Sequence, residues 1–398
     1  MKAIFEKLQG DRVIWMVAMF LSIISILAVY SGISTLAYKA DGSTLKLMLK
    51  HSIMIGAGFV LMYYVHKIHF KYFPKFSVLL IWIAGILLLL TFFVGSNLNS
   101  ADRWLPIPYT GLTFQPSDMA KFVLIIYVAR LLHQRREMLD DFRNGVLPVI
   151  LPVAIICGLI LRSNFSTAFI LAIVCLIMMF IAGVPGRHLF KLMGAGVGVI
   201  LLIVAVGELT PADTLPRYQT WKNRIFNKVE GNDEGNYQVN IAKYAISEGG
   251  LFPSLPGSGS TRNFLPHPYS DMIYAWIIEE YGSLLGGIGV MMLYVILLFR
   301  SIRIASKCPK FYASLIAVGL SLLLVTQAMV NMAVAVDLFP TTGQPLPLVS
   351  LGGTSTIFTC LAIGLILSIS RSVFNPELLD NPTVVDENDT VNNHPAVA

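Results

Sequence analysis

Long apolar runs separated by short polar segments dominate the pattern of this chain. Each run approaches the roughly 20 apolar residues that a helix needs to cross the hydrocarbon core of a bilayer. The pattern therefore predicts an all-α polytopic membrane protein with about ten transmembrane helices. The expected helices cover residues 13–37, 48–66, 77–97, 115–132, 147–162, 166–184, 188–208, 271–299, 311–336 and 354–374. No small-residue cleavage site follows the first run, which favours a retained helix over a removed signal peptide.

Two segments depart from the pattern of helices and short loops. Residues 209–270 are rich in charge, Pro and Gly but also contain aromatic side chains, which predicts one large structured loop. Residues 337–353 (DLFPTTGQPLPLVSLGG) contain too many prolines and glycines for a helix. Irregular backbone near a membrane is tolerated only when it is buried in protein or lines a wet cavity. We therefore expect a polar cavity beside this segment.

Lys and Arg residues orient the expected bundle. Lys and Arg are frequent in the N-terminal segment and in every second segment between the apolar runs. The short loops on the other side of the expected membrane contain few of them. By the positive-inside rule both termini are expected in the cytoplasm, with 209–270 and 337–353 outside. Residues 1–374 are expected to form a single transmembrane domain. The acidic tail 375–398 has no Lys or Arg and is expected to be a disordered cytoplasmic extension.

Composition excludes a soluble protein. Hydrophobic residues make up 55% of the chain and charged residues 13%, against roughly 45–50% and about 25% in soluble domains. The net charge of +6 follows from the basic connecting segments, so no nucleic-acid partner is expected. Membrane lipid is the expected surrounding.

A few ionisable groups lie in or beside the expected spans, where they are costly and are candidates for function. Asp118 and Lys121 are three residues apart on one helix face, and a structural ion pair would also explain them. Asp271 follows Ser270, a good N-cap, at the start of the eighth run, where a helix-dipole role is the alternative. Arg103 and Trp104 suit an interfacial anchor equally well. An isolated carboxylate with several cations fits a phosphate-bearing ligand.

Several motifs occur in the order found in the SEDS family of RodA and FtsW, which this sequence resembles from about residue 11 to 375. They are DRWLPI at 102–107, QPSDMAK at 115–121, NYQVNIAKYAISEGGLF at 236–252, NFLPHPYSDMIYAWIIEEYG at 263–282 and NMAVAVDLFPTTGQPLPLVSLGGTS at 331–355. The resemblance implies ten helices, both ends cytoplasmic, and polymerisation of lipid II, the undecaprenyl-diphosphate-linked disaccharide, outside the bacterial cytoplasmic membrane.

The resemblance also implies roles for individual residues. Asp271 matches the family's essential aspartate and is the expected catalytic base. The substrate-binding candidates are Arg103, Trp104, Asp118, Lys121, Arg224, Gln238, Thr341, Thr342 and Ser350. Arg103, Lys121 and Arg224 would neutralise the diphosphate as it leaves. The sequence leaves open whether a divalent cation, Mg²⁺ or Mn²⁺, bridges Asp271 and the diphosphate.

One departure from the family pattern removes a carboxylate, because Arg162-Ser163-Asn164 stands where the family has Gln-Pro-Asp. We therefore expect no acid or base there. The expected partners are a class B penicillin-binding protein, which is a transpeptidase, and other proteins of the divisome or elongasome. The compact large loop favours an FtsW-like enzyme of septal wall synthesis. The alternatives are a RodA-like elongation polymerase and a flippase for lipid II or a related polyprenyl-diphosphate lipid.

Overall fold

The computed structural model describes residues 8–39, 44–94, 96–98, 101–107, 112–210, 218–224, 237–254, 259, 261 and 271–375. Side chains within 32–47, 92–103 and 106–112 are outside this description. The expected disordered tail lies almost wholly outside the described residues, as do large parts of the expected loop 209–270.

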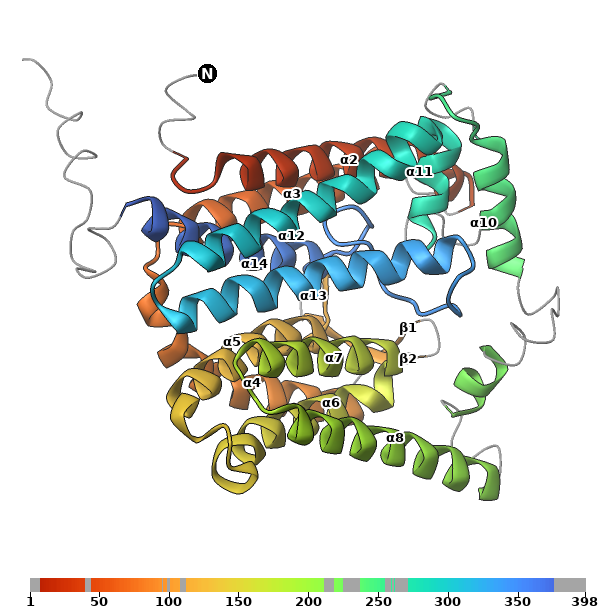
Figure 1. Ribbon diagram of the computed structural model, residues 1–398. Coiled ribbons are helices and arrows are strands. Elements are labelled where there is room, and N and C mark those ends of the chain that lie inside the picture. The colour runs from red at the N-terminus through yellow and green to blue at the C-terminus, as the bar shows by residue number, and fades with distance from the viewer. Residues whose placement is uncertain are drawn as a thin grey trace, which may run out of the picture.

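Every apolar run found in the sequence contains a helix. The long helices are α2 (Arg12–Lys39), α3 (Thr44–Val65), α4 (Phe73–Val94), α5 (Pro116–Gln134), α6 (Leu147–Ser163), α7 (Phe165–Ile181), α8 (Gly186–Leu209), α12 (Val290–Lys307), α13 (Phe311–Ala335) and α14 (Thr354–Phe374). Figure 1 shows them as a bundle of rods lying side by side. Within the described chain, eight helical stretches are long and apolar enough to cross a membrane. The expected class, a polytopic helical membrane protein, is confirmed.

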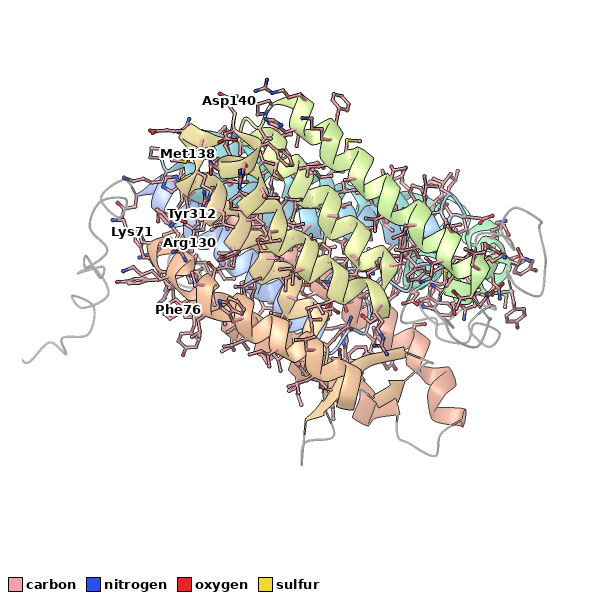
Figure 2. All side chains as sticks on the ribbon, turned by 90° about the horizontal axis from the view of Figure 1, so that it is seen from below. Lys71, Phe76, Arg130, Met138, Asp140 and Tyr312 are labelled. Atoms are coloured by element: carbon pink, nitrogen blue, oxygen red, sulfur yellow. The ribbon has the colours of Figure 1, made fainter. Side chains whose placement is uncertain are left out.

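The bundle has two chemically different ends. At the end that we call the basic end, Arg300 donates through Nε to Asp11 at 2.8 Å, and Arg130 donates to the backbone oxygen of Pro74 at 3.2 Å. Figure 2 shows Lys71 and Arg130 close together at this end. The opposite end, called the loop end, carries three short antiparallel strands, β1 (Ser96–Leu98), β2 (Ala101–Ile107) and β3 (Leu112–Phe114). Helix α10 (Tyr237–Glu248) also lies there (Figure 1).

Burial separates a central helix from a peripheral one. In the most apolar 18-residue stretch of α13, 72% of the residues are buried within the protein. In the corresponding stretch of α8 the share is 0%. A helix that is apolar all round suits either a protein interior or lipid. Helix α13 is therefore surrounded by other helices, and α8 exposes nearly all of its surface to lipid.

The expected single helix 271–299 is broken in the structure, which corrects that prediction. Helix α11 (Ile273–Tyr281) ends at Gly282, where φ is 72°, and a π-helical stretch, η5 (Gly282–Gly289), runs back against it into α12. A Cβ atom on Gly286 would lie 2.5 Å from the backbone oxygen of Ile277, so the two arms touch through glycine. The expectation that Asp271 lies in a first helical turn is also wrong, since the N-cap of α11 is Met272.

Candidate functional site

The irregular segment 337–353 is held in place by side chains from neighbouring helices. Its prolines break the backbone hydrogen-bond ladder, and a buried carbonyl without a partner is costly. The amide of Gln327 donates to the oxygen of Pro345 at 2.9 Å, and the hydroxyl of Tyr294 donates to that of Pro347 at 2.5 Å. Ser25 Oγ donates to the oxygen of Val349 at 2.7 Å. Helices α13, α12 and α2 thus fix one extended, non-helical stretch at the loop end.

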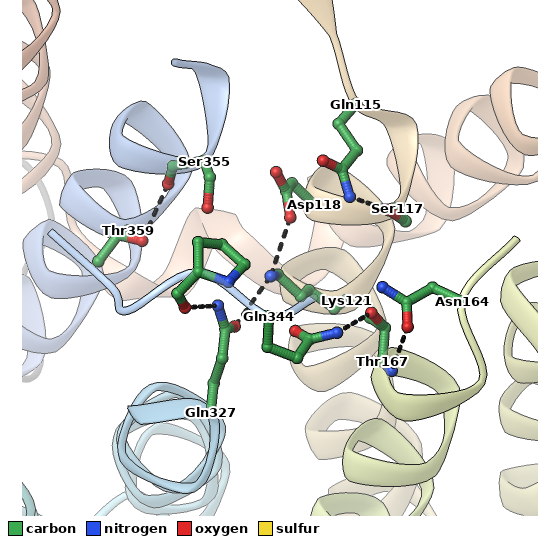
Figure 3. A network of polar contacts seen from close by, with 11 residues as sticks. Gln115, Ser117, Asp118, Lys121, Asn164, Thr167, Gln327, Gln344, Ser355 and Thr359 are labelled. Carbon is green, nitrogen blue, oxygen red and sulfur yellow. Dashed lines mark hydrogen bonds and ion pairs between the residues drawn. The ribbon is translucent and has the colours of Figure 1, made fainter. Parts of the chain in front are cut away.

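Asp118 and Lys121 form a buried ion pair next to this segment. Lys121 Nζ lies 2.9 Å from Asp118 Oδ1, and the side chains of Lys121 and Asp118 are 3% and 4% exposed. The same Nζ donates to Gln327 Oε1 at 3.0 Å, as Figure 3 shows. The pairing predicted from the three-residue spacing is present. It also ties α5 to α13 and, through Gln327, to Pro345.

Asp271 reaches the same segment through its backbone. The side-chain amide of Asn331 donates to the backbone oxygen of Asp271 at 2.8 Å and to that of Gln344 at 2.7 Å. Asp271 is half-buried and lies immediately before α11 at the loop end. One irregular segment therefore connects the two strongest candidates of the sequence, Asp271 and Lys121.

Several helices begin around Gln344. Its side-chain amide donates to Thr167 Oγ1 in the first turn of α7 at 2.5 Å. In Figure 3 the first turns of α5, α7 and α14 face the centre that Gln344 occupies, and α11 starts nearby through the Asn331 contact. The N-terminal end of a helix carries partial positive charge and unpaired N–H groups, which favour anions. The helix starts therefore add partial positive charge to a centre in which Lys121 is already paired with Asp118.

The sequence resemblance implies a carboxylate at the position of Asn164, and the structure gives this asparagine a local role. It is the N-cap of α7, with Oδ1 accepting from the backbone N–H of Thr167 at 3.2 Å. An asparagine is among the preferred N-cap residues because its short side chain reaches the first turn. The departure from the family pattern thus keeps the helix start while removing the charge.

A cavity of about 530 Å³ opens between α7 and α8 at the loop end. Its wall is mainly apolar, with Phe165 and Phe169 from α7 and Ile203 from α8. Its polar rim contains Asn164, Glu208, Lys222, Arg224, Thr341 and Thr342. Asp271 is not among the lining residues, but Val330, next to Asn331, is. The cavity therefore adjoins the polar centre across one face of α13.

Two parts of the large loop are attached to the irregular segment. Arg224 donates through Nη1 to the backbone oxygen of Thr341 at 2.9 Å. Lys243 of α10 pairs with Asp337, with Nζ 2.5 Å from Oδ2. Tyr218 donates to Glu208, and this hydrogen bond raises the pKa of Tyr218 above its ordinary value. The described parts of the loop thus pack on the bundle.

The other sequence candidates lie in different places. Trp104 is half-buried in β2, and Arg103 belongs to the same strand, although its side chain is not described. Gln238 is exposed on α10. Ser350 is 2% exposed and accepts from the backbone N–H of Leu346 at 2.8 Å. Within the described ranges no three His, Cys, Asp or Glu side chains group as a metal site.

Sequence reasoning missed the amide side chains that build the centre: Gln327, Asn331 and Gln344. The signal was present, since Gln327 and Asn331 are polar residues one helical turn apart within a long apolar run. Their partners are remote in sequence, however, and only the fold brings them together.

These features define a multi-pass helical membrane protein with a buried polar centre and an apolar cavity at one end. The family model described as "Cell cycle protein", covering FtsW, RodA and SpoVE, matches residues 11–375. The chain therefore belongs to the FtsW/RodA/SpoVE family, as the sequence motifs indicated.

Individual relatives agree with this membership. A protein of Trichlorobacter lovleyi named "Probable peptidoglycan glycosyltransferase FtsW" is 30% identical, with 93% of this chain and 95% of that protein covered. A solved structure titled "Structural coordination of polymerization and crosslinking by a peptidoglycan synthase complex" contains a chain with 26% identity and a TM-score of 0.72, covering 92% of this chain and 99% of that one. Thermus thermophilus RodA, at 24% identity and a TM-score of 0.62, covering 92% of this chain and 98% of its own, shares the fold.

Proposed function

We propose that this chain is a peptidoglycan glycosyltransferase that polymerises lipid II into glycan strands for septal wall synthesis. The similarity to proteins named for this activity supports the reaction class. The loop end faces the outside of the bacterial cytoplasmic membrane, because the basic end carries the Lys and Arg residues that favour the cytoplasm.

One observation carries the assignment of the site. Asp271 and Lys121 are both linked to the segment 344–345, through Asn331 and Gln327 respectively. The backbone of the proposed base and the side chain of a cation are thus tied to one segment, and glycosyl transfer from a diphosphate donor needs a base and a cation beside the reacting atoms. A plain structural ion pair accounts for Lys121 and Asp118 but leaves the attachment of Asp271 unexplained.

In the proposed step, Asp271 accepts the proton of the acceptor 4-hydroxyl as that oxygen attacks C1 of the donor sugar. The bond from C1 to the diphosphate breaks with its electron pair, and a β-1,4 bond forms with inversion. Inverting hydrolases need a second carboxyl group to protonate an alkoxide leaving group. A lipid diphosphate leaves without that proton, so a single base suffices here.

The departing diphosphate is stabilised by positive charge. Lys121 supplies a fixed cation, and the helix starts around Gln344 add main-chain N–H groups. Arg224 approaches from the cavity rim and Arg103 from the strand β2. The substrate-binding roles of Trp104, Asp118, Gln238, Thr341, Thr342 and Ser350 belong to the same proposal.

The lipid part of the substrate fits the cavity between α7 and α8. Its apolar wall suits polyprenyl chains, and its rim provides Lys222, Arg224 and the threonines 341 and 342 for the head group. Because α8 contacts few other parts of the described chain and faces lipid, a chain can enter from the bilayer without crossing water. The transpeptidase partner, a class B penicillin-binding protein, would crosslink the product, and other divisome proteins would accompany it.

Reconstitution in liposomes with labelled lipid II and the transpeptidase partner tests this function. We expect long glycan strands on gel analysis. Movement of the label to the opposite leaflet without strand formation would instead indicate a flippase. Strand formation that requires an elongation-type partner and not a division-type one would place the chain in the RodA branch.

A further inference from the structure

Gln327 and Asn331 form an amide pair on one face of the central helix α13. They are four residues apart, so their side chains lie one above the other. Gln327 is 3% exposed and Asn331 is 1% exposed. An amide buried in an apolar helix is costly unless it is hydrogen-bonded, so each of these side chains needs a specific set of partners.

Each amide makes two kinds of contact. One contact fixes the irregular segment: Gln327 donates to the oxygen of Pro345 at 2.9 Å, and Asn331 donates to that of Gln344 at 2.7 Å. The other contact is to a candidate of the proposed site: Gln327 Oε1 accepts from the side chain of Lys121, and Asn331 donates to the backbone oxygen of Asp271. At successive turns of the helix, each residue thus joins the irregular segment to one candidate, Gln327 through both its amide atoms and Asn331 through its NH₂ alone.

The orientation of the Asn331 amide is unambiguous. Both of its contacts are backbone carbonyl oxygens, which only accept, so the group that faces them must be the NH₂. The amide of Asn331 therefore has one orientation, and it binds the backbone of Asp271 to the helix α13.

We propose that Gln327 and Asn331 are positioning residues that set the separation between the cation Lys121 and the base Asp271. This inference rests on the proposed glycosyl transfer. Four residues of an α-helix advance about 6 Å, and this rise fixes how far apart along α13 the Lys121 side chain and the Asp271 backbone are held. Misplacement of a reacting group by about 1 Å can cost a hundredfold in rate, so such a spacer controls turnover more than substrate affinity.

The test compares N331L and Q327M with S321A in liposomes with the transpeptidase partner and labelled lipid II. Leu keeps the branched shape and heavy-atom count of the Asn side chain, Met is close to Gln in size, and both remove the amide. Ser321 is a matched control, because it is buried in the same helix and donates only to Val318 of its own turn. Rates are expressed per folded molecule, with the folded fraction taken from the amplitude of the thermal unfolding transition.

We expect N331L to lower kcat at least about tenfold, Q327M to lower it several-fold, and both to leave KM for lipid II within about threefold of wild type. S321A should match wild type. Equal kcat per folded molecule for N331L and S321A would overturn the inference, since the amide would then serve folding alone. If N331L fails to fold, N331D carries the test, because it keeps the size of the side chain and removes both donors. Absence of glycan strands with the wild-type protein would instead refute the proposed function.

Discussion

Lys121 and Asp118 form an ion pair within the first two turns of α5, with Nζ 2.9 Å from Oδ1 and both side chains almost entirely buried. Lys121 also contacts Gln327 of α13. Lys121 is therefore paired with Asp118 in its own helix and also contacts the polar centre through Gln327. Removing Lys121 alone would mix these two contributions, because it leaves the Asp118 carboxylate buried without its counter-charge.

A pair of variants separates stability from activity at this ion pair. K121M should lower the free energy of unfolding by about 3–5 kcal/mol, the usual cost of breaking a buried pair. D118N/K121M removes both charges and should recover most of that loss. If Lys121 stabilises the diphosphate, the double variant stays inactive although it is stable. Thermal unfolding in detergent and strand formation in liposomes measure the two effects, and an active double variant would exclude the catalytic role.

Asp271→Asn should abolish polymerisation without affecting the fold. The backbone oxygen that accepts from Asn331 is retained, so the local structure should persist. Loss of a general base typically costs a factor of about 10²–10⁴, and we expect kcat to fall at least about a hundredfold. E248Q is the control, because Glu248 is an exposed acid at the end of α10. Wild-type rates for D271N would show that another group accepts the proton.

Gly282→Ala should disrupt the reversal between α11 and η5. A φ of 72° with ψ of 163° is a conformation that only glycine adopts readily, and the new Cβ would lie 2.6 Å from the carbonyl carbon of Phe252. We expect a loss of about 1–3 kcal/mol from the backbone conformation alone, with lower activity because α11 follows Asp271.

Gly289→Ala provides the control for that substitution. Gly289 has a helical φ of −58°, and the nearest atom to its added Cβ is 3.6 Å away. Thermal unfolding should leave G289A close to wild type. Equal midpoints for G282A and G289A would argue against the broken helix.

Ile203→Trp should narrow the cavity between α7 and α8. Because Ile203 lines the apolar wall, the larger ring would occupy space assigned to the polyprenyl chain. We expect KM for lipid II to rise several-fold with a smaller change in kcat. Leu202→Trp is the matched control, since Leu202 is 64% exposed on the lipid side of the same helix. Identical KM values for the two variants would place the lipid elsewhere.

The helices could be predicted because apolar runs of membrane length leave few alternatives. The break at Gly282 could not, since a glycine in an apolar run also occurs at helix contacts. Only the observed positive φ distinguishes the two uses. The start of α11 was misplaced for a different reason: Ser270 has the chemistry of an N-cap and suggested an earlier start, whereas the N-cap is Met272.

At the candidate site, local spacing was informative and long-range contacts were not. Asp118 and Lys121 are neighbours on one helix, so their pairing followed from sequence. The contacts of Asn331 join residues 60 and 13 positions away, and no periodicity encodes such distances. The role assigned to Asp271 stays a prediction that the D271N variant addresses, and the roles of Arg103 and the cavity-rim residues stay predictions.

The convergence of helix starts around Gln344 has a consequence for mutational robustness. In the proposed site, part of the attraction for the diphosphate would come from main-chain dipoles, which no side-chain replacement deletes. The position and direction of these dipoles depend on where each helix begins. Pro116 occupies the first position of α5, and Gly353 is the N-cap of α14. Exchanging a charged side chain here therefore removes one contribution, whereas altering such a boundary residue redirects an entire helix terminus.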